Sequence, residues 1–115
     1  MNTYFGNIIV EGNNVQAAIK AVRDLSIPGL QFAPEGVVTF DPKNPQSNYE
    51  GKFPVYLLEF CIEAPSLPRA AKEIGIRISK AAMSAANERV SIQIFGDRWG
   101  KKAKIENGVV KMIYL

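Results

Sequence analysis

The chain has 115 residues, of which 47% are hydrophobic and 22% charged, so residues 1–115 are the size of one domain that can bury a core without a disulfide or a metal. It contains no histidine and a single cysteine, which excludes catalytic triads that use histidine and zinc sites that need histidine or several cysteines. The net charge of +3 is uneven: residues 1–57 carry four basic and five acidic residues, and residues 58–115 carry ten basic and six acidic ones. The second half weakly favours an anionic partner.

The N-terminal part predicts a strand followed by a helix. Residues 4–11 contain three consecutive β-branched residues, which favour a strand. Either Asn13 or Asn14 can cap a helix over residues 14–25, and Pro28-Gly29 ends it. Within this range hydrophobic residues recur at helical spacing, at Val15, Ala18, Ile19, Val22 and Leu25.

Two further strands follow, separated by a long loop. Residues 30–41 are strand-like but are interrupted by Pro34-Glu35-Gly36, which predicts either a turn between two short strands or a bulge. Residues 41–54 have the composition of a loop, and they form either an ordinary hairpin tip or a functional loop. Residues 55–63 are the clearest strand, and its two apolar faces predict a central position in the sheet. One of these faces carries Tyr56, Leu58, Phe60 and Ile62.

The longest helix is predicted over residues 66–88. Pro65-Ser66 stops the preceding strand and supplies a helix cap, and Pro68 is tolerated because it lies in the first turn. Hydrophobic residues then recur at alternating steps of three and four. We expect them to form one buried stripe, which consists of Leu67, Ala71, Ile74, Ile78, Ala81 and Ala85.

The C-terminal part predicts three more strands. A strand over residues 90–95 is followed by a turn from Gly96 to Gly100 and a strand-like segment at 103–105. Asn107-Gly108 is a two-residue hairpin signal that precedes the last strand. The order β-α-β-β-α-β with an extra C-terminal hairpin predicts an α+β, ferredoxin-like split βαβ fold, with an antiparallel sheet and two helices on one face.

Several short segments occur in the order found in a known family. They are Asn2 and Asn7 before Ile8-Ile9-Val10-Glu11-Gly12, the turn Phe40-Asp41-Pro42, and Trp99-Gly100-Lys101. In these segments, and in the order of elements across most of the chain, the sequence resembles the YubB-like ferredoxin-fold proteins of plasmids and phages. The aromatic-rich segment that this family carries around its tryptophan is missing. The resemblance implies an accessory protein of a mobile element without a settled activity, and it identifies no catalytic residue.

The first candidate site is a basic stretch that contains the only tryptophan of the chain. As a binding platform, Trp99 would stack on a base while cations neutralise phosphate. Alternatively, Trp99 packs on the core and the lysines keep an edge hairpin soluble. The stretch is not a phosphate loop, because its spacing is one residue short and neither Ser, Thr nor a helix follows. The candidate anion-binding residues are Arg98, Trp99, Lys101, Lys102 and Lys104.

The outer face of the predicted long helix is the second candidate site. Ile76 and Met83 lie there among cations, and an apolar centre ringed by charge is typical of a partner-binding surface. The alternative is a solvated face on which the two hydrophobic residues are incidental. The candidate partner-binding residues are Arg69, Lys72, Ile76, Arg77, Lys80 and Met83.

Two further sets, both on strand 55–63, have better structural explanations. Glu59 and Glu63 flank Cys61 on one face, and ion pairing with neighbouring strands explains them better than acid–base catalysis does. Without a histidine nothing activates Cys61 as a nucleophile. Tyr56 and Phe60 resemble the base-stacking aromatics of RNA-recognition domains, but packing under a helix explains them better.

We therefore expect a cytoplasmic, non-catalytic binding protein with no metal or cofactor. Residues 1–6 carry no cationic or long apolar segment, and no apolar run reaches the roughly 20 residues that span a bilayer. The leading hypothesis is a phage or mobile-element accessory or inhibitor protein that binds a protein partner or itself, through the outer helix face and the sheet edge. The alternative is a nucleic-acid or nucleotide-binding protein that uses the segment Arg98-Trp99-Gly100-Lys101-Lys102.

Overall fold

The computed structural model describes residues 1–40, 55–83, 89–96 and 100–114, and over residues 34–40 it describes the backbone alone. The elements of these ranges, in chain order, are β1 (Asn2–Glu11), α1 (Val15–Arg23), β2 (Gln31–Phe40), β3 (Val55–Ala64), α2 (Leu67–Arg69), the π-helical segment η1 (Ala70–Gly75), α3 (Ile76–Met83), β4 (Arg89–Phe95), β5 (Lys101–Glu106) and β6 (Val109–Tyr114). Because α2, η1 and α3 follow one another without a break, they form one rod, called the long helix below.

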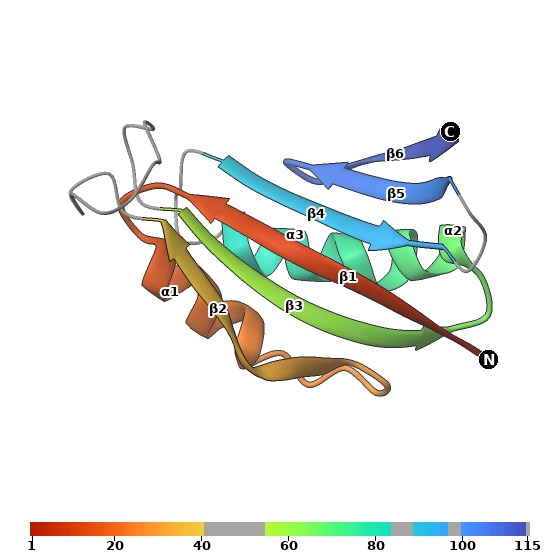
Figure 1. Ribbon diagram of the computed structural model, residues 1–115, viewed down its shortest axis with the longest axis horizontal. Coiled ribbons are helices and arrows are strands. Elements are labelled where there is room, and N and C mark those ends of the chain that lie inside the picture. The colour runs from red at the N-terminus through yellow and green to blue at the C-terminus, as the bar shows by residue number, and fades with distance from the viewer. Residues whose placement is uncertain (41–54, 84–88, 97–99, 115) are drawn as a thin grey trace.

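The strands form one antiparallel sheet in the order β2-β3-β1-β4-β5-β6 (Figure 1). Both α1 and the long helix lie behind this sheet in Figure 1, so they cover the same face. The predicted α+β class with an antiparallel sheet and two helices is confirmed. The expected C-terminal hairpin is β5–β6, whose turn residues Asn107 and Gly108 have φ angles of 51° and 83°, as a two-residue hairpin turn requires.

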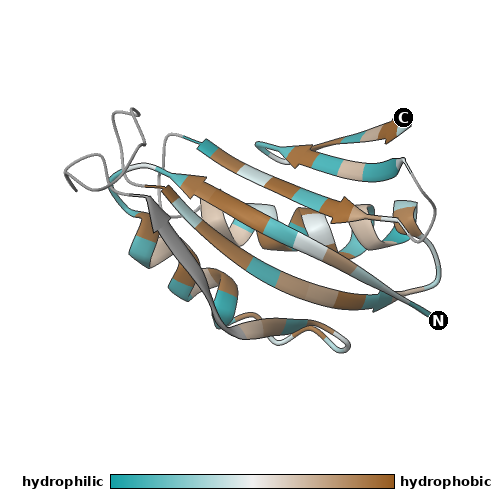
Figure 2. Ribbon diagram, in the orientation of Figure 1, coloured by the Kyte–Doolittle hydropathy of each residue, from teal (hydrophilic) through white to brown (hydrophobic). Residues whose placement is uncertain are grey.

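The core lies between the sheet and the two helices. Side chains alternate across a strand, and Figure 2 shows hydrophobic segments recurring along the strands. The residues that point from the inner strands toward the helices are buried: Tyr4, Ile8, Val10, Leu58, Phe60, Ile62, Val90, Ile92, Ile94, Ala103 and Ile105. The helices bury their own stripes against them, which include Val15, Ala18, Val22, Leu67, Ala71, Ile74 and Ile78.

Two glycines allow close approach within this core. A Cβ atom on Gly6 would lie 2.5 Å from the carbonyl oxygen of Gln93 and 2.7 Å from Cζ of Phe60, so the Phe60 ring occupies the space that a side chain would need. A Cβ atom on Gly75 would collide with Cδ1 of Ile105. Glycine at this position therefore lets the long helix lie close against β5.

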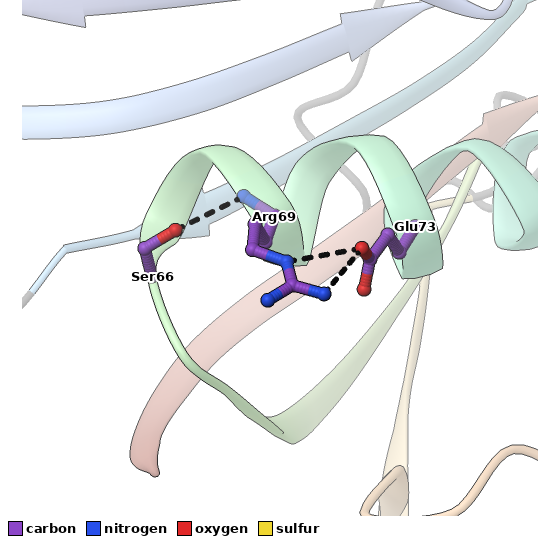
Figure 3. Close-up of polar contacts among 3 residues, drawn as sticks. All are labelled: Ser66, Arg69 and Glu73. Carbon is purple, nitrogen blue, oxygen red and sulfur yellow. Dashed lines mark hydrogen bonds and ion pairs between the residues drawn. The ribbon is translucent and has the colours of Figure 1, made fainter.

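The long helix begins at a cap formed by Ser66 (Figure 3). Its Oγ accepts a hydrogen bond of 3.4 Å from the backbone N–H of Arg69, which satisfies one of the free donors of the first turn. The Arg69 guanidinium donates two further bonds, of 3.0 and 2.9 Å, to Oε1 of Glu73. The cap predicted at Ser66 is confirmed. In α1, Asn14 occupies the cap position, but its side chain makes no capping bond.

The remaining predictions about the elements have mixed outcomes. β2 is one strand whose pairing with β3 shifts register between Phe32 and Val37, so the interruption is an irregularity within the strand. β3 lies between β2 and β1, as its two apolar faces predict. Residues 84–88 and the loop 41–54 lie outside the described residues. Within the described part, the predicted helical stripe is buried or half-buried, at Leu67, Ala71, Ile74, Ile78 and Ala81.

Candidate functional site

The face of the sheet that points away from the helices, called the open face here, is covered by no described element (Figure 1). Its side chains alternate with the buried ones along each strand. Most of them are exposed or half-buried, whereas most of their neighbours along the chain are buried; Ser91, which also belongs to this face, is buried. Strands β1, β3, β4 and β5 contribute Phe5, Asn7, Ile9, Leu57, Glu59, Cys61, Gln93, Phe95, Lys102 and Lys104.

Two phenylalanines stand side by side on the open face, where β4 ends. Phe5 on β1 pairs directly with Phe95 on β4, and their side chains are 66% and 43% exposed. Adjacent side chains on paired strands lie about 5 Å apart at their Cβ atoms, so these two exposed residues belong to one apolar patch. Half-buried Ile9, Leu57 and Cys61 on β1 and β3 extend this patch. Large adjoining apolar side chains left in water mark an interaction surface rather than scattered exposure.

A shallow hollow of about 310 Å³ adjoins Phe5 at the β2 side of the sheet. The irregularity in β2 accounts for its position, because the register shift follows Phe32, one of the lining residues. The hollow therefore continues the apolar patch toward the sheet edge. Its lining consists of Phe5, Gln31, Phe32, Ala33, Glu59, Phe60 and Cys61.

Charged side chains lie on both sides of the aromatic pair. Glu59 and Glu63 on β3 are exposed and make no ion pair within the described residues, so the ion pairs expected for them with neighbouring strands are not found there. On the opposite side, Lys102 Nζ donates a 3.2 Å hydrogen bond to Oε1 of Gln93, and Lys104 lies 3.1 Å from Glu106. The open face therefore has an acidic side on β3 and a basic side on β5.

Glu106 forms ion pairs with two cations, Lys104 and Arg89, at the end of the basic side. Its Oε1 lies 3.1 Å from Lys104 Nζ and 3.2 Å from Arg89 Nη2. The hydrogen bonds from Lys104 and then Arg89 lower the pKa of Glu106, because they stabilise the ionised carboxylate. The positive charge of Lys104 and Arg89 is thus partly neutralised within the chain.

Asn7 lies in the centre of the open face, between Glu59 on β3 and Gln93 on β4. Its Oδ1 is buried and has no hydrogen-bond partner within the described residues. A buried acceptor that stays unsatisfied costs free energy, so a donor from a bound group would find an available acceptor here.

The basic stretch predicted as an anion site does not lie on one surface. Lys102 and Lys104 point to the open face, whereas Lys101 alternates with them and points to the covered side. Lys101 Nζ lies 5.4 Å from the centre of the Tyr114 ring, and Lys101 lines a separate hollow of about 300 Å³ with Asn2 and Ser66. Arg98 and Trp99 lie outside the described residues.

The outer face of the long helix is charged with little apolar surface. Arg69, Lys72, Arg77 and Lys80 are all exposed, as predicted. Ile76 is half-buried, and Met83 is 40% exposed while its Sδ accepts a 3.6 Å hydrogen bond from Ser79 Oγ. The apolar centre expected on this face is therefore smaller than the Phe5–Phe95 patch.

The two aromatic residues singled out on β3 have structural roles. Phe60 is only 3% exposed and packs edge-on against Phe32, and the Tyr56 hydroxyl accepts a 2.7 Å hydrogen bond from Gln16 of α1. The packing interpretation of these two aromatics is confirmed. Within the described residues no group of three acidic, cysteine or histidine side chains could hold a metal ion.

The central residues of the open face were missed in the sequence. Phe5 and Phe95 occupy strand positions that alternate with buried residues. The signal that could have identified them is the alternation Tyr4, Gly6, Ile8, Val10 in β1, combined with the presence of only two predicted helices. Two helices cover one face of a sheet, so a large apolar residue out of phase with the buried set must lie on the uncovered face.

Comparison with known proteins finds no family model, no curated protein and no solved structure that matches this chain. No helix in the described ranges has both the length and the apolar composition needed to cross a membrane.

Proposed function

We propose that this chain is a small non-catalytic binding domain that acts through protein–protein contacts made by its open face. The observation that supports this most is the exposed pair Phe5 and Phe95 on neighbouring strands. Aromatic side chains at the centre of a charged rim are the usual anchors of a protein interface. The leading hypothesis from the sequence is thus retained, but its surface moves from the helix to the sheet.

Nucleic-acid binding on the same face is the second candidate. Lys102 pairs with Phe95 across β4 and β5, and a cation beside an exposed ring favours base stacking with phosphate contact. Against it, Glu106 partly neutralises Lys104, and the exposed Glu59 and Glu63 would repel a phosphate backbone. Titration with oligonucleotides at two salt concentrations tests it, and tight binding that weakens steeply with salt would favour this alternative.

We further propose that β1 to β4, with the two helices, form a ferredoxin-like split βαβ unit. The antiparallel order β2-β3-β1-β4 supports this, because it places the two βα units side by side with both helices on one face. The β5–β6 hairpin extends the unit beyond β4. A YubB-like origin and a role as a phage or mobile-element accessory protein remain predictions from the sequence resemblance.

Site-specific photo-crosslinking in cells that express the chain tests the proposed function. A photoreactive phenylalanine analogue at position 95 samples the open face, and the same analogue at position 80 samples the outer face of the long helix. We expect a discrete protein adduct from position 95 and none from position 80. Adducts from position 80 alone, or adducts to nucleic acid, would contradict the proposal.

A further inference from the structure

One pair of opposite charges on the open face, Glu59 and Lys104, is placed symmetrically about the line between β1 and β4. Strand pairing places four residues in one row across the sheet: Glu59, Asn7, Gln93 and Lys104. The adjacent row on the same face contains Phe5 and Phe95 beside that line. β3 lies one strand beyond β1 and β5 lies one strand beyond β4, so Glu59 and Lys104 are equally far from the line.

We propose that the partner of the open face is a second copy of this chain, packed face to face about a two-fold axis that runs along the β1–β4 line. This inference rests on the proposed function of the same face. The axis exchanges β1 with β4 and β3 with β5, and each residue stays in its row. Phe5 of each copy then lies over Phe95 of the other, and Glu59 lies opposite Lys104 of the other.

Charge complementarity selects this axis over the alternative. A two-fold axis that runs across the strands would place β3 over β3, and therefore bring Glu59 and Glu63 near their own copies. Like charges placed together at an interface oppose association. The axis along the strands gives two Glu59–Lys104 contacts instead, as in an isologous dimer that pairs residue i with residue j twice.

The dimensions of the face permit such a dimer. Packed sheets lie about 10 Å apart with their strands within about 30° of each other, a distance that phenylalanine, glutamate and lysine side chains fill from both sides. Six strands about 4.8 Å apart and six residues long form a face of roughly 500 Å² in projection. Two faces bury roughly 1,000 Å², the lower end for a specific interface, so we expect a reversible dimer with a dissociation constant on the order of micromolar.

Charge exchange between two variants tests the proposal directly. Glu59→Lys places lysine opposite Lys104 at both contacts, and Lys104→Glu places glutamate opposite Glu59 at both. Each variant alone should dimerise about tenfold more weakly than the original chain in sedimentation equilibrium. In an equimolar mixture, both contacts of the mixed dimer again join a lysine to a glutamate. The mixture should therefore recover dimerisation, although Lys104→Glu also removes the internal contact to Glu106.

Lys80→Glu is the matched control, because it reverses one exposed charge on the outer face of the long helix. It should leave the dimer unchanged, and circular dichroism verifies that every variant is folded. Phe95→Asp, which removes an aromatic ring from the centre of the interface, should abolish dimerisation without unfolding the domain.

Three results would overturn the second-copy proposal. A folded chain that stays monomeric from roughly 1 μM to 1 mM does not bind a second copy, and the crosslinking experiment then still decides the proposed function. A dimer that tolerates Glu59→Lys, Lys104→Glu and their mixture equally does not use this axis. A dimer that only Lys80→Glu weakens lies on the helix, and it contradicts the proposed function as well.

Discussion

The two faces of the sheet differ although the same strands build both. On the covered face, Ile8, Leu58 and Ile92 are fully buried beneath the helices. On the open face, Phe5 and Phe95 remain 66% and 43% exposed. Because side chains alternate along a strand, neighbours in sequence can serve different purposes. The covered face stabilises the domain, and the open face is the surface that we propose binds a partner.

The largest difference in stability between the two faces is expected when each of two adjacent isoleucines is replaced by alanine. Ile8→Ala leaves a cavity in the core and should lower the free energy of unfolding by about 2–5 kcal/mol. Ile9 is half-buried on the open face, so Ile9→Ala should cost about 1–2 kcal/mol, since part of its surface is already in water. Urea unfolding at low protein concentration, where a dimer adds no stability, compares them. Equal losses would mean that the open face is a second core surface.

Substitutions at the adjacent positions 5 and 6 compare the stability contributions of the two faces a second time. Gly6→Ala forces a methyl group against the Gln93 carbonyl and the Phe60 ring and should destabilise the domain by about 1–3 kcal/mol. Phe5→Ala, on the open face, should change the free energy of unfolding by at most about 0.5 kcal/mol. Thermal unfolding of both variants measures the difference. A large loss in Phe5→Ala would show that this ring stabilises the folded monomer.

A smaller effect is expected where the long helix begins. Ser66→Ala removes the side-chain bond to the Arg69 N–H and should cost about 1 kcal/mol. Glu73→Ala, the matched control, breaks only an exposed pair with Arg69, which is worth about 0.5 kcal/mol or less. If urea unfolding ranks these two variants in the reverse order, the helix start depends on its surface charges rather than on its cap.

The smallest effect on stability is expected from the protonation of Glu106 at low pH. Lys104 and Arg89 lower the pKa of Glu106 below its ordinary value of about 4.5. The ionised contact therefore stabilises the fold above that pH, and this contribution is lost as the pH falls through the lowered pKa. Glu106→Gln should remove a small decrease in stability below about pH 4.5. An unchanged pH profile of the unfolding midpoint would mean that these exposed charges contribute nothing.

The order of elements could be predicted from the sequence because local signals indicate each of them. The Asn107-Gly108 turn, the cap at Ser66 and the two apolar faces of β3 agree with the structure. They depend on contacts close in sequence or on the alternation within one strand. The anion site predicted from the cluster of basic residues agrees less well with the structure. Lys101 and Lys102 are consecutive in the sequence, but they point to opposite faces of the sheet.

The open face could not be predicted by the same reasoning. Its central pair joins Phe5 to Phe95 through the pairing of β1 with β4, a contact between opposite ends of the chain. No local pattern shows which strands become neighbours. The basic stretch and the helix face could be proposed as sites because their residues are close in sequence, whereas the pair Phe5 and Phe95 comes together only when the sheet forms.

The reactivity of Cys61 tests the role of the open face most directly. This residue is half-buried on that face and pairs with Phe5, so a bound partner should shield its thiol. We expect the rate of alkylation by a maleimide to fall as the protein concentration rises through the dimerisation range, and to stay constant in Phe95→Asp. A rate that is independent of concentration in a chain that sedimentation shows to be dimeric would contradict binding at the open face.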